Sequence, residues 1–176
     1  MSSMDYAEVY TALHRKRDTI FSGRSVLPHV KSIRELVIQH NPKTLIDYGC
    51  GKGLQYSLDK VQRQWYNKMP LLYDIGVPKY SARPVPVGTV GIICTDVLEH
   101  IQEEDLPAIL TDIYSFKPVF AFFSISCKPA KKTFKDGRNM HLTIKSPLWW
   151  ADFIKPYKNE DCHNRVAYTG VTNEDH

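Results

Sequence analysis

The sequence lacks the features that define several classes of protein. No apolar run approaches the roughly 20 residues needed to cross a bilayer, and the N-terminal segment MSSMDYAEVYTALHRKRD has no hydrophobic region of a secretory signal. The four cysteines are widely spaced with no Cys-x-x-Cys pair, which argues against a disulfide framework and a structural zinc site. We therefore expect a cytoplasmic protein that needs no metal, no membrane and no disulfide.

What is present fits an ordinary globular protein. The chain has 176 residues, 43% hydrophobic and 24% charged, with a formal net charge of +4. These values predict one compact domain over residues 1–176. The charge is too small to indicate nucleic-acid binding by itself.

Hydrophobic periodicity predicts two helices before residue 42. Apolar residues at helical spacing carry the first: Tyr6, Val9, Tyr10, Leu13 and Ile20. Ser25 is the predicted cap of the second, and Asn41-Pro42 ends it because a residue before proline avoids the helical region.

Short apolar runs then alternate with helical patterns. The predicted strands are 44–47, 71–74, 90–94 and 119–125, and the predicted helices are 54–66, with Leu58, Val61 and Trp65 on one face, and 103–114. Strands that are apolar on both faces and alternate with helices favour a doubly wound, Rossmann-like α/β sandwich with a mainly parallel sheet.

The chain divides into three parts by pattern. Residues 1–40 hold the N-terminal helices, 43–125 hold the predicted core, and 126–176 hold a polar loop, a short helix and a tail. Ser146 caps the short helix with Pro147 at its first position, and residues 165–168 read as a last strand.

A glycine-rich loop follows the first predicted strand. Its spacing is Gly49-x-Gly51-x-Gly53, and Leu54 breaks the dinucleotide pattern G-x-G-x-x-G. Glycine lets the backbone turn sharply and approach a ligand closely. We expect the helix after it to present unpaired N–H groups to that ligand.

The run from Leu45 to Gly53 resembles the first motif of class I S-adenosylmethionine-dependent methyltransferases. The resemblance implies that S-adenosylmethionine is the cofactor and that the loop cradles its methionine and ribose parts. The loop residues it implicates are Asp47, Tyr48, Gly49, Cys50, Gly51 and Gly53.

Three further segments resemble the same family. Asp74 stands where the family has the carboxylate that binds the ribose hydroxyls. Residues 94–100 resemble the fourth motif, which implies that Asp96 and Val97 line the cofactor pocket. Residues 21–25 resemble a lid that precedes the core, which implies that Arg24 reaches the cofactor's carboxylate.

One segment departs from the family pattern. Residues 77–86 carry three prolines, which exclude an ordinary helix. The chain is therefore shortened between the second and fourth motif strands, and the third motif, which helps to hold adenine, has no counterpart.

Candidates for chemistry are Asp96, His100 and His141. If a helix begins near Asp96, then Asp96 and His100 lie on one face, four residues apart, where a base could serve an oxygen or nitrogen acceptor. The alternative is that Asp96 and Glu99 only favour a helix start, that His100 is exposed, and that His141 bonds to the backbone.

The loop after the last core strand is basic: Lys128, Lys131, Lys132, Lys135 and Arg138 face one opposing charge, Asp136. An anionic acceptor, nucleic acid included, is one interpretation. A solvated surface loop is the other, and the sequence alone favours it. Phe134 is the only aromatic residue of the loop, which argues against a platform that stacks the bases of a single strand.

The sequence thus predicts a methyltransferase whose acceptor is not identified. The alternative is an S-adenosylmethionine-binding protein of the same fold without transfer activity. A nicotinamide-dependent oxidoreductase is disfavoured by Leu54 and by the lack of a second, substrate-holding domain.

Overall fold

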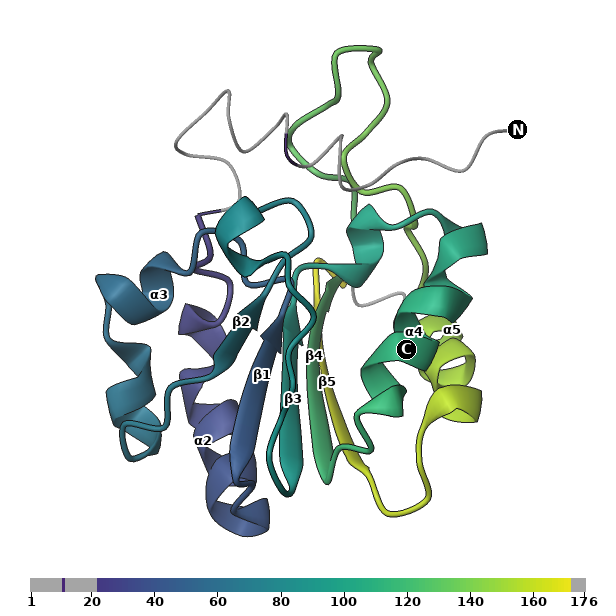
Figure 1. The fold of residues 1–176 in the computed structure, drawn as a ribbon. Helices are drawn as coiled ribbons and strands as arrows, with labels where there is room; N and C mark the ends of the chain where they lie inside the picture. The colour runs from purple at the N-terminus through teal and green to yellow at the C-terminus, as the bar shows by residue number, and fades with distance from the viewer. Residues whose placement is uncertain (1–10, 12–21, 172–176) are drawn as a thin grey trace. The chain divides into compact units, whose positions relative to one another are not determined.

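The computed structural model describes residues 11 and 22–171 and shows an α/β fold (Figure 1). Its five strands belong to one sheet in the order β2-β1-β3-β4-β5. The chain forms two compact units, residues 1–93 and 94–176, called unit 1 and unit 2 below. A single domain over residues 1–176 stays a prediction.

Unit 1 is built on β1, the strand Thr44–Tyr48. The strand β2 (Leu71–Tyr73) and the first residues of β3 (Val90–Thr95) pair with it in parallel on its two sides. Residue Ile46 lies opposite Leu71 on one side and Ile92 on the other. The carboxyl ends of β1 and β2 therefore meet.

The helices of unit 1 precede and follow β1. The helix α2 (Val30–His40) ends as predicted, with Asn41 in the left-handed region at φ 38°. The short α3 (Leu54–Ser57) and the 3-10 helix η2 (Val61–Trp65) come after β1, and α2 packs against η2.

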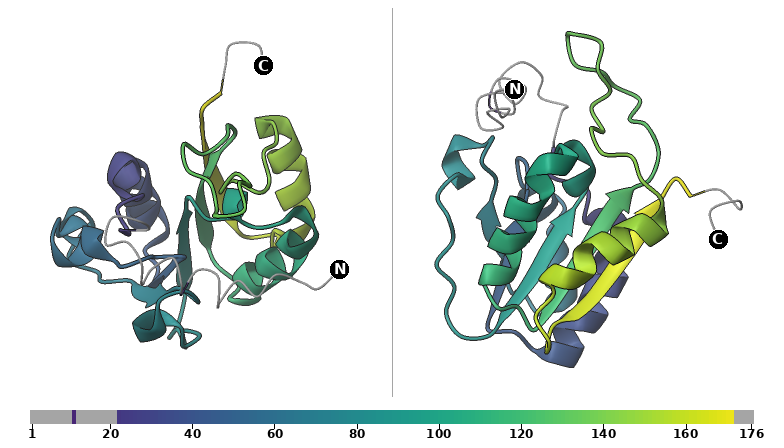
Figure 2. Two further views of the ribbon diagram at one scale, coloured as in Figure 1. Left: turned by 90° about the horizontal axis from the view of Figure 1, so that it is seen from above. Right: turned by 90° about the vertical axis from the view of Figure 1, so that its right-hand side faces the viewer.

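Unit 2 contains the pair β4 (Phe120–Ser126) and β5 (His163–Thr169), which are parallel along their whole length. Every residue of β4 is buried, as expected for a strand covered on both faces. The helices α4 (Leu106–Ser115) and α5 (Pro147–Ile154) lie side by side against this pair (Figure 2). The cap prediction for α5 is confirmed, because Ser146 Oγ accepts from Trp149 N at 3.3 Å.

Several predicted elements differ in the structure. The helix expected over 54–66 is interrupted between α3 and η2, where Lys60 adopts φ 54°. Leu58 is 62% exposed, while Val61 and Trp65 are buried. The strand β2 is half-exposed and not buried, because it is an edge strand.

Two helix starts also lie later than predicted. Ser25 does not cap α2, because the 3-10 helix η1 (Leu27–His29) intervenes and no side chain caps Val30. The predicted start at 103 is the 3-10 helix η5 (Glu103–Asp105), and α4 follows it. Apart from residue 11, the first predicted helix lies outside the described residues, and so do the last five residues of the tail.

Candidate functional site

The glycine turn, residues 49–53, joins β1 to α3. Gly49, Gly51 and Gly53 have φ of 81°, 54° and 63°, conformations that a side chain makes costly. The three-glycine spacing thus suits the backbone conformation of the turn. Gly51 and Gly53 are buried within the turn, and Gly49 is half-exposed.

The turn is hydrogen-bonded to the end of β2. The N–H groups of Gly49 and Cys50 both donate to the carbonyl oxygen of Tyr73, at 2.7 and 3.1 Å. The ring of Tyr73 contacts that of Tyr48 edge-to-face, with centroids 5.0 Å apart. Residues predicted from two separate motifs are therefore adjacent in unit 1.

Asp74, directly after β2, is bonded to the turn. Its Oδ2 accepts from Gly51 N at 2.8 Å, and its Oδ1 accepts from Gly76 N at 2.9 Å. Both bonds come from backbone N–H groups, so the carboxylate is held in one orientation while half-exposed.

The segment Ser22–Gly23 crosses the turn on another side. The carbonyl oxygen of Ser22 accepts from Leu54 N at 3.2 Å, and that of Gly23 accepts from Gln55 N at 2.9 Å. A Cβ on Gly23 would lie 2.3 Å from the Cys50 carbonyl oxygen. The prediction of unpaired N–H groups at the start of this helix is therefore wrong, because a distant segment satisfies them.

Asp47 supports the turn from within. Its side chain is 1% exposed and Oδ2 accepts from Gln55 Nε2 at 2.8 Å. Burial raises its pKa to about 7, a rise that the nearby Tyr56 and Gln55 side chains reduce and Asp74 increases. Asp47 Oδ1 and the Tyr56 hydroxyl lack a partner of standard hydrogen-bond geometry among the described residues.

Cys50 and Arg24, two further predicted residues, both contact other residues of the protein. The Cys50 thiol donates to the Gly51 carbonyl oxygen at 3.4 Å. The Cys50 thiol is buried, which raises its pKa so that it stays protonated. Arg24 forms a two-point ion pair with Asp59, at 2.8 Å from Nε and 3.1 Å from Nη2. Arg24 directly follows the segment that crosses the turn, and its guanidinium faces the Asp59 carboxylate.

The remaining predicted residues lie in unit 2, where Asp96 follows β3. Asp96 adopts φ 54°; its N–H donates to the Ser124 carbonyl oxygen, and Ser124 Oγ donates to its Oδ1, both at 3.0 Å. No α-helix begins at Asp96, contrary to the expectation. The 3-10 helix η4 (Leu98–His100) follows instead, with Val97 as its first flanking residue.

Glu99, inside η4, is the most buried carboxyl of unit 2, at 0% exposure. Its Oε1 accepts from Ser126 N at 2.8 Å, and its backbone oxygen accepts from Leu142 N and Thr143 N. Burial, and secondly Asp96, raise its pKa to about 8, so the carboxyl is mostly protonated at neutral pH. Its Oε2 has no partner among the described residues.

His100 and His141 meet edge-to-face, with centroids 4.8 Å apart. Because a carbonyl oxygen only accepts, each ring must donate from Nδ1: His100 to Met140 at 2.8 Å and His141 to Lys128 at 2.6 Å. Burial, and secondly His141, lower the pKa of His100 to about 4. Its Nε2 is therefore unprotonated at neutral pH.

The structure thus forms two groups from the predicted residues. Asp47, Asp74 and the glycines belong to unit 1, and Asp96, His100 and His141 belong to unit 2. Sequence reasoning did not single out Glu99, Gly23 or Gln55 as site residues. Glu99 and Gln55 both stand among other polar residues, so their burial has no local signature in the sequence.

Comparison with models of protein families, with curated proteins and with solved structures gives no match to the chain. Within the part that the structure describes, no group of His, Cys, Asp or Glu could hold a metal ion. None of the helices in that part has the length and apolar character that a membrane span requires.

Proposed function

We propose that the protein is an S-adenosylmethionine-dependent methyltransferase with a doubly wound, Rossmann-like sandwich shortened between its second and fourth motif strands. The observation that carries the proposal is the bond between Gly51 N and Asp74 Oδ2, 2.8 Å long. It joins a three-glycine turn and a carboxylate at the carboxyl ends of adjacent parallel strands. Ligands of open α/β sheets bind at such ends.

The residues of unit 1 fit the cofactor's chemistry. A carboxylate such as that of Asp74 is the kind of acceptor that a pair of ribose hydroxyls requires, and Gly49, the half-exposed glycine of the turn, presents no Cβ to a ligand. The bound cofactor would supply an electrophilic methyl group on a sulfonium.

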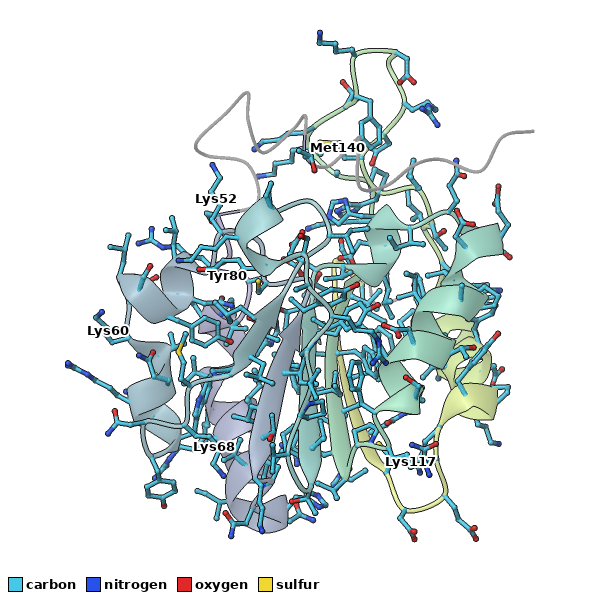
Figure 3. The ribbon with its side chains drawn as sticks, viewed as in Figure 1. Lys52, Lys60, Lys68, Tyr80, Lys117 and Met140 are labelled. Atoms are coloured by element: carbon cyan, nitrogen blue, oxygen red, sulfur yellow. The ribbon has the colours of Figure 1, made fainter. Side chains whose placement is uncertain are left out.

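Tyr80 is our candidate for contact with the adenine ring. Residues 75–89 form only the 3-10 helix η3 (Pro78–Tyr80), and Tyr80 is half-exposed beside the turn (Figure 3). Its ring carbon Cε2 would lie 3.7 Å from a Cβ on Gly53, and its carbonyl oxygen accepts from Asp74 N at 3.0 Å. The backbone of Tyr80 is therefore bonded to the residue that we assign to the ribose. Its aromatic ring offers a surface on which adenine can stack.

The histidines of unit 2 are suited to orienting an acceptor. His100 offers an unprotonated Nε2, which can accept from an O–H or N–H of the acceptor. Its low pKa makes it a weak proton acceptor, since an efficient general base titrates near the working pH. We therefore assign His100 to positioning, and His141 and Asp96 to contacts with the same group.

Calorimetry separates the cofactor assignments. We expect saturable binding of S-adenosylmethionine and much weaker binding of NAD. Asp74→Asn should weaken the former roughly ten-fold or more, since a hydrogen bond to a charged group contributes about 1.5–3 kcal/mol. Glu35→Gln, which removes an exposed carboxylate on α2, is the matched control. Stronger binding of NAD, or equal binding by Asp74→Asn, contradicts the proposal.

The absence of a longer element between β2 and β3 favours one alternative, a cofactor-binding protein without transfer activity. Incubation with labelled methyl donor and a cell extract decides between the two. Label in a protein, nucleic acid or metabolite, lost in Gly51→Val, supports transfer. Cofactor binding without label in any fraction supports the alternative.

A further inference from the structure

The basic loop of unit 2 is an ordered hairpin, called the basic hairpin here and comprising residues 128–139. Thr133 and Asn139 form an antiparallel bridge, Phe134 N donates to the Arg138 carbonyl oxygen at 2.8 Å, and Gly137 N donates to that of Phe134 at 3.1 Å. In Figures 1 and 2 this green segment extends beyond the carboxyl end of β4. The segment is thus a solvated surface loop, as the sequence favours, whose backbone is closed by an isolated bridge.

The base of the hairpin is bonded to the histidine pair. Asn139 Oδ1 accepts from both Ala130 N and His141 N at 2.9 Å, and its Nδ2 donates to the Ala130 carbonyl oxygen at 2.9 Å. His141 Nδ1 donates to the Lys128 carbonyl oxygen. Met140, labelled in Figure 3, is buried at this base and bonds to His100. The base of the hairpin is therefore directly bonded to both histidines.

The surface of the hairpin is cationic and not apolar. Its four lysines and its arginine are all exposed, and the one acidic side chain, Asp136, is paired with Arg138 at 2.8 Å. None of the exposed large apolar side chains in the described residues lies between 128 and 139. Protein interfaces have apolar cores and membrane-binding segments carry apolar groups, so this surface favours a polyanion.

One feature favours a single strand over a duplex. The guanidinium of Arg138 lies over the ring of Phe134, 5.7 Å from the centroid, and Phe134 is half-exposed. Phe134 thus offers part of an aromatic ring surface next to a guanidinium, among exposed lysines. A splayed base can stack on such a surface, whereas the bases of a duplex stack on one another.

We propose that the basic hairpin binds single-stranded nucleic acid, with phosphates on its lysines and a base on the Phe134–Arg138 pair. The binding stands independently of any reaction. That the bound strand is also the methyl acceptor rests on the function proposed above.

Fluorescence anisotropy with a labelled 12-nucleotide oligouridylate tests the binding, without S-adenosylmethionine and between 25 and 200 mM salt. The Lys131→Gln/Lys132→Gln variant should bind roughly ten-fold more weakly at low salt, with a salt slope smaller by about 1.4, since each phosphate contact on a single strand contributes about 0.7. The control Lys155→Gln/Lys158→Gln removes two exposed charges of unit 2 elsewhere and should change affinity less than about two-fold.

Phe134→Ala tests the stacking part and should weaken oligouridylate about five-fold or more, since stacking on one base contributes about 1–3 kcal/mol. A duplex of the same length should bind less tightly than the single strand. Thermal unfolding confirms that each variant folds.

Several results would overturn the proposal: no binding at 25 mM salt, an equal loss in both double variants, duplex binding as tight as that of the single strand, or tighter binding to phosphatidylserine vesicles. If oligouridylate binds but no label is transferred, the function proposed above fails and the hairpin assignment stands. If the cofactor binds and oligouridylate does not, only the hairpin assignment fails.

Discussion

The buried carboxyl of Glu99 gives unit 2 a stability that depends on pH. The folded state holds this carboxyl at a pKa of about 8, against 4.5 for an ordinary glutamate, chiefly because of burial. Glu99→Gln keeps an oxygen that accepts from Ser126 N and removes the ionisation. The difference between the two proteins therefore isolates the contribution of Glu99 from those of other titrating groups.

The direction follows from proton uptake. A group whose folded pKa is raised contributes full stability below its unfolded pKa and loses it as pH rises through the folded pKa. Between about 4.5 and 8 the folded protein binds the proton that the unfolded chain has released. The free energy of unfolding should then fall by about 1.4 kcal/mol per pH unit, to a maximal loss of roughly 5 kcal/mol.

Urea unfolding followed by tryptophan fluorescence, at intervals between pH 5 and 9, measures this loss. Glu99→Gln should be no more stable than the parent at pH 5 and more stable by several kcal/mol at pH 8.5. Glu104→Gln, an exposed position on the neighbouring 3-10 helix, should follow the parent at every pH. Parallel curves for Glu99→Gln and the parent would refute the reasoning, because they would mean that Glu99 ionises in the folded state as in the unfolded one.

Three other predictions concern the backbone, a helix cap and the thiols. Gly23→Ala should destabilise unit 1 by more than about 2 kcal/mol. Gly137→Ala, with φ 87° and no atom near its Cβ, should cost only about 1 kcal/mol. Equal losses of stability in urea unfolding would contradict the contact between Gly23 and Cys50. Ser146→Ala should cost about 1 kcal/mol through loss of the α5 cap, and an unchanged unfolding midpoint would count against that cap. In native alkylation followed by mass spectrometry, half-buried Cys127 should react before buried Cys50; the reverse order would be inconsistent with the burial described here.

The sequence predicts the parts of the fold that depend on local patterns. The strand β1, the end of α2 at Asn41 and the capped start of α5 at Ser146 all follow from residues within a few positions. The break at Lys60 does not, because a lysine in the left-handed region has no local signature. Likewise, β2 reads as buried because its apolar run does not reveal that it is an edge strand.

Some features of the candidate site also follow from local sequence, and others depend on distant residues. The glycine turn and Asp74 are visible in the sequence, because backbone geometry restricts which residues can stand there. The crossing of the turn by Gly23 and the burial of Glu99 depend on residues about 30 positions away, such as Gln55 and Ser126. The pairing of His100 with His141 depends on how the basic hairpin folds back, which its composition alone does not show.

The central claim is that the turn of residues 49–53, together with Asp74, binds S-adenosylmethionine, and amide chemical shifts measure it most directly. Titration of isotope-labelled protein should give saturable shifts that are largest at Gly49, Gly51, Gly53 and Asp74, and NAD should not reproduce them. Shifts that do not saturate, or that are confined to residues far from the turn, would contradict the account.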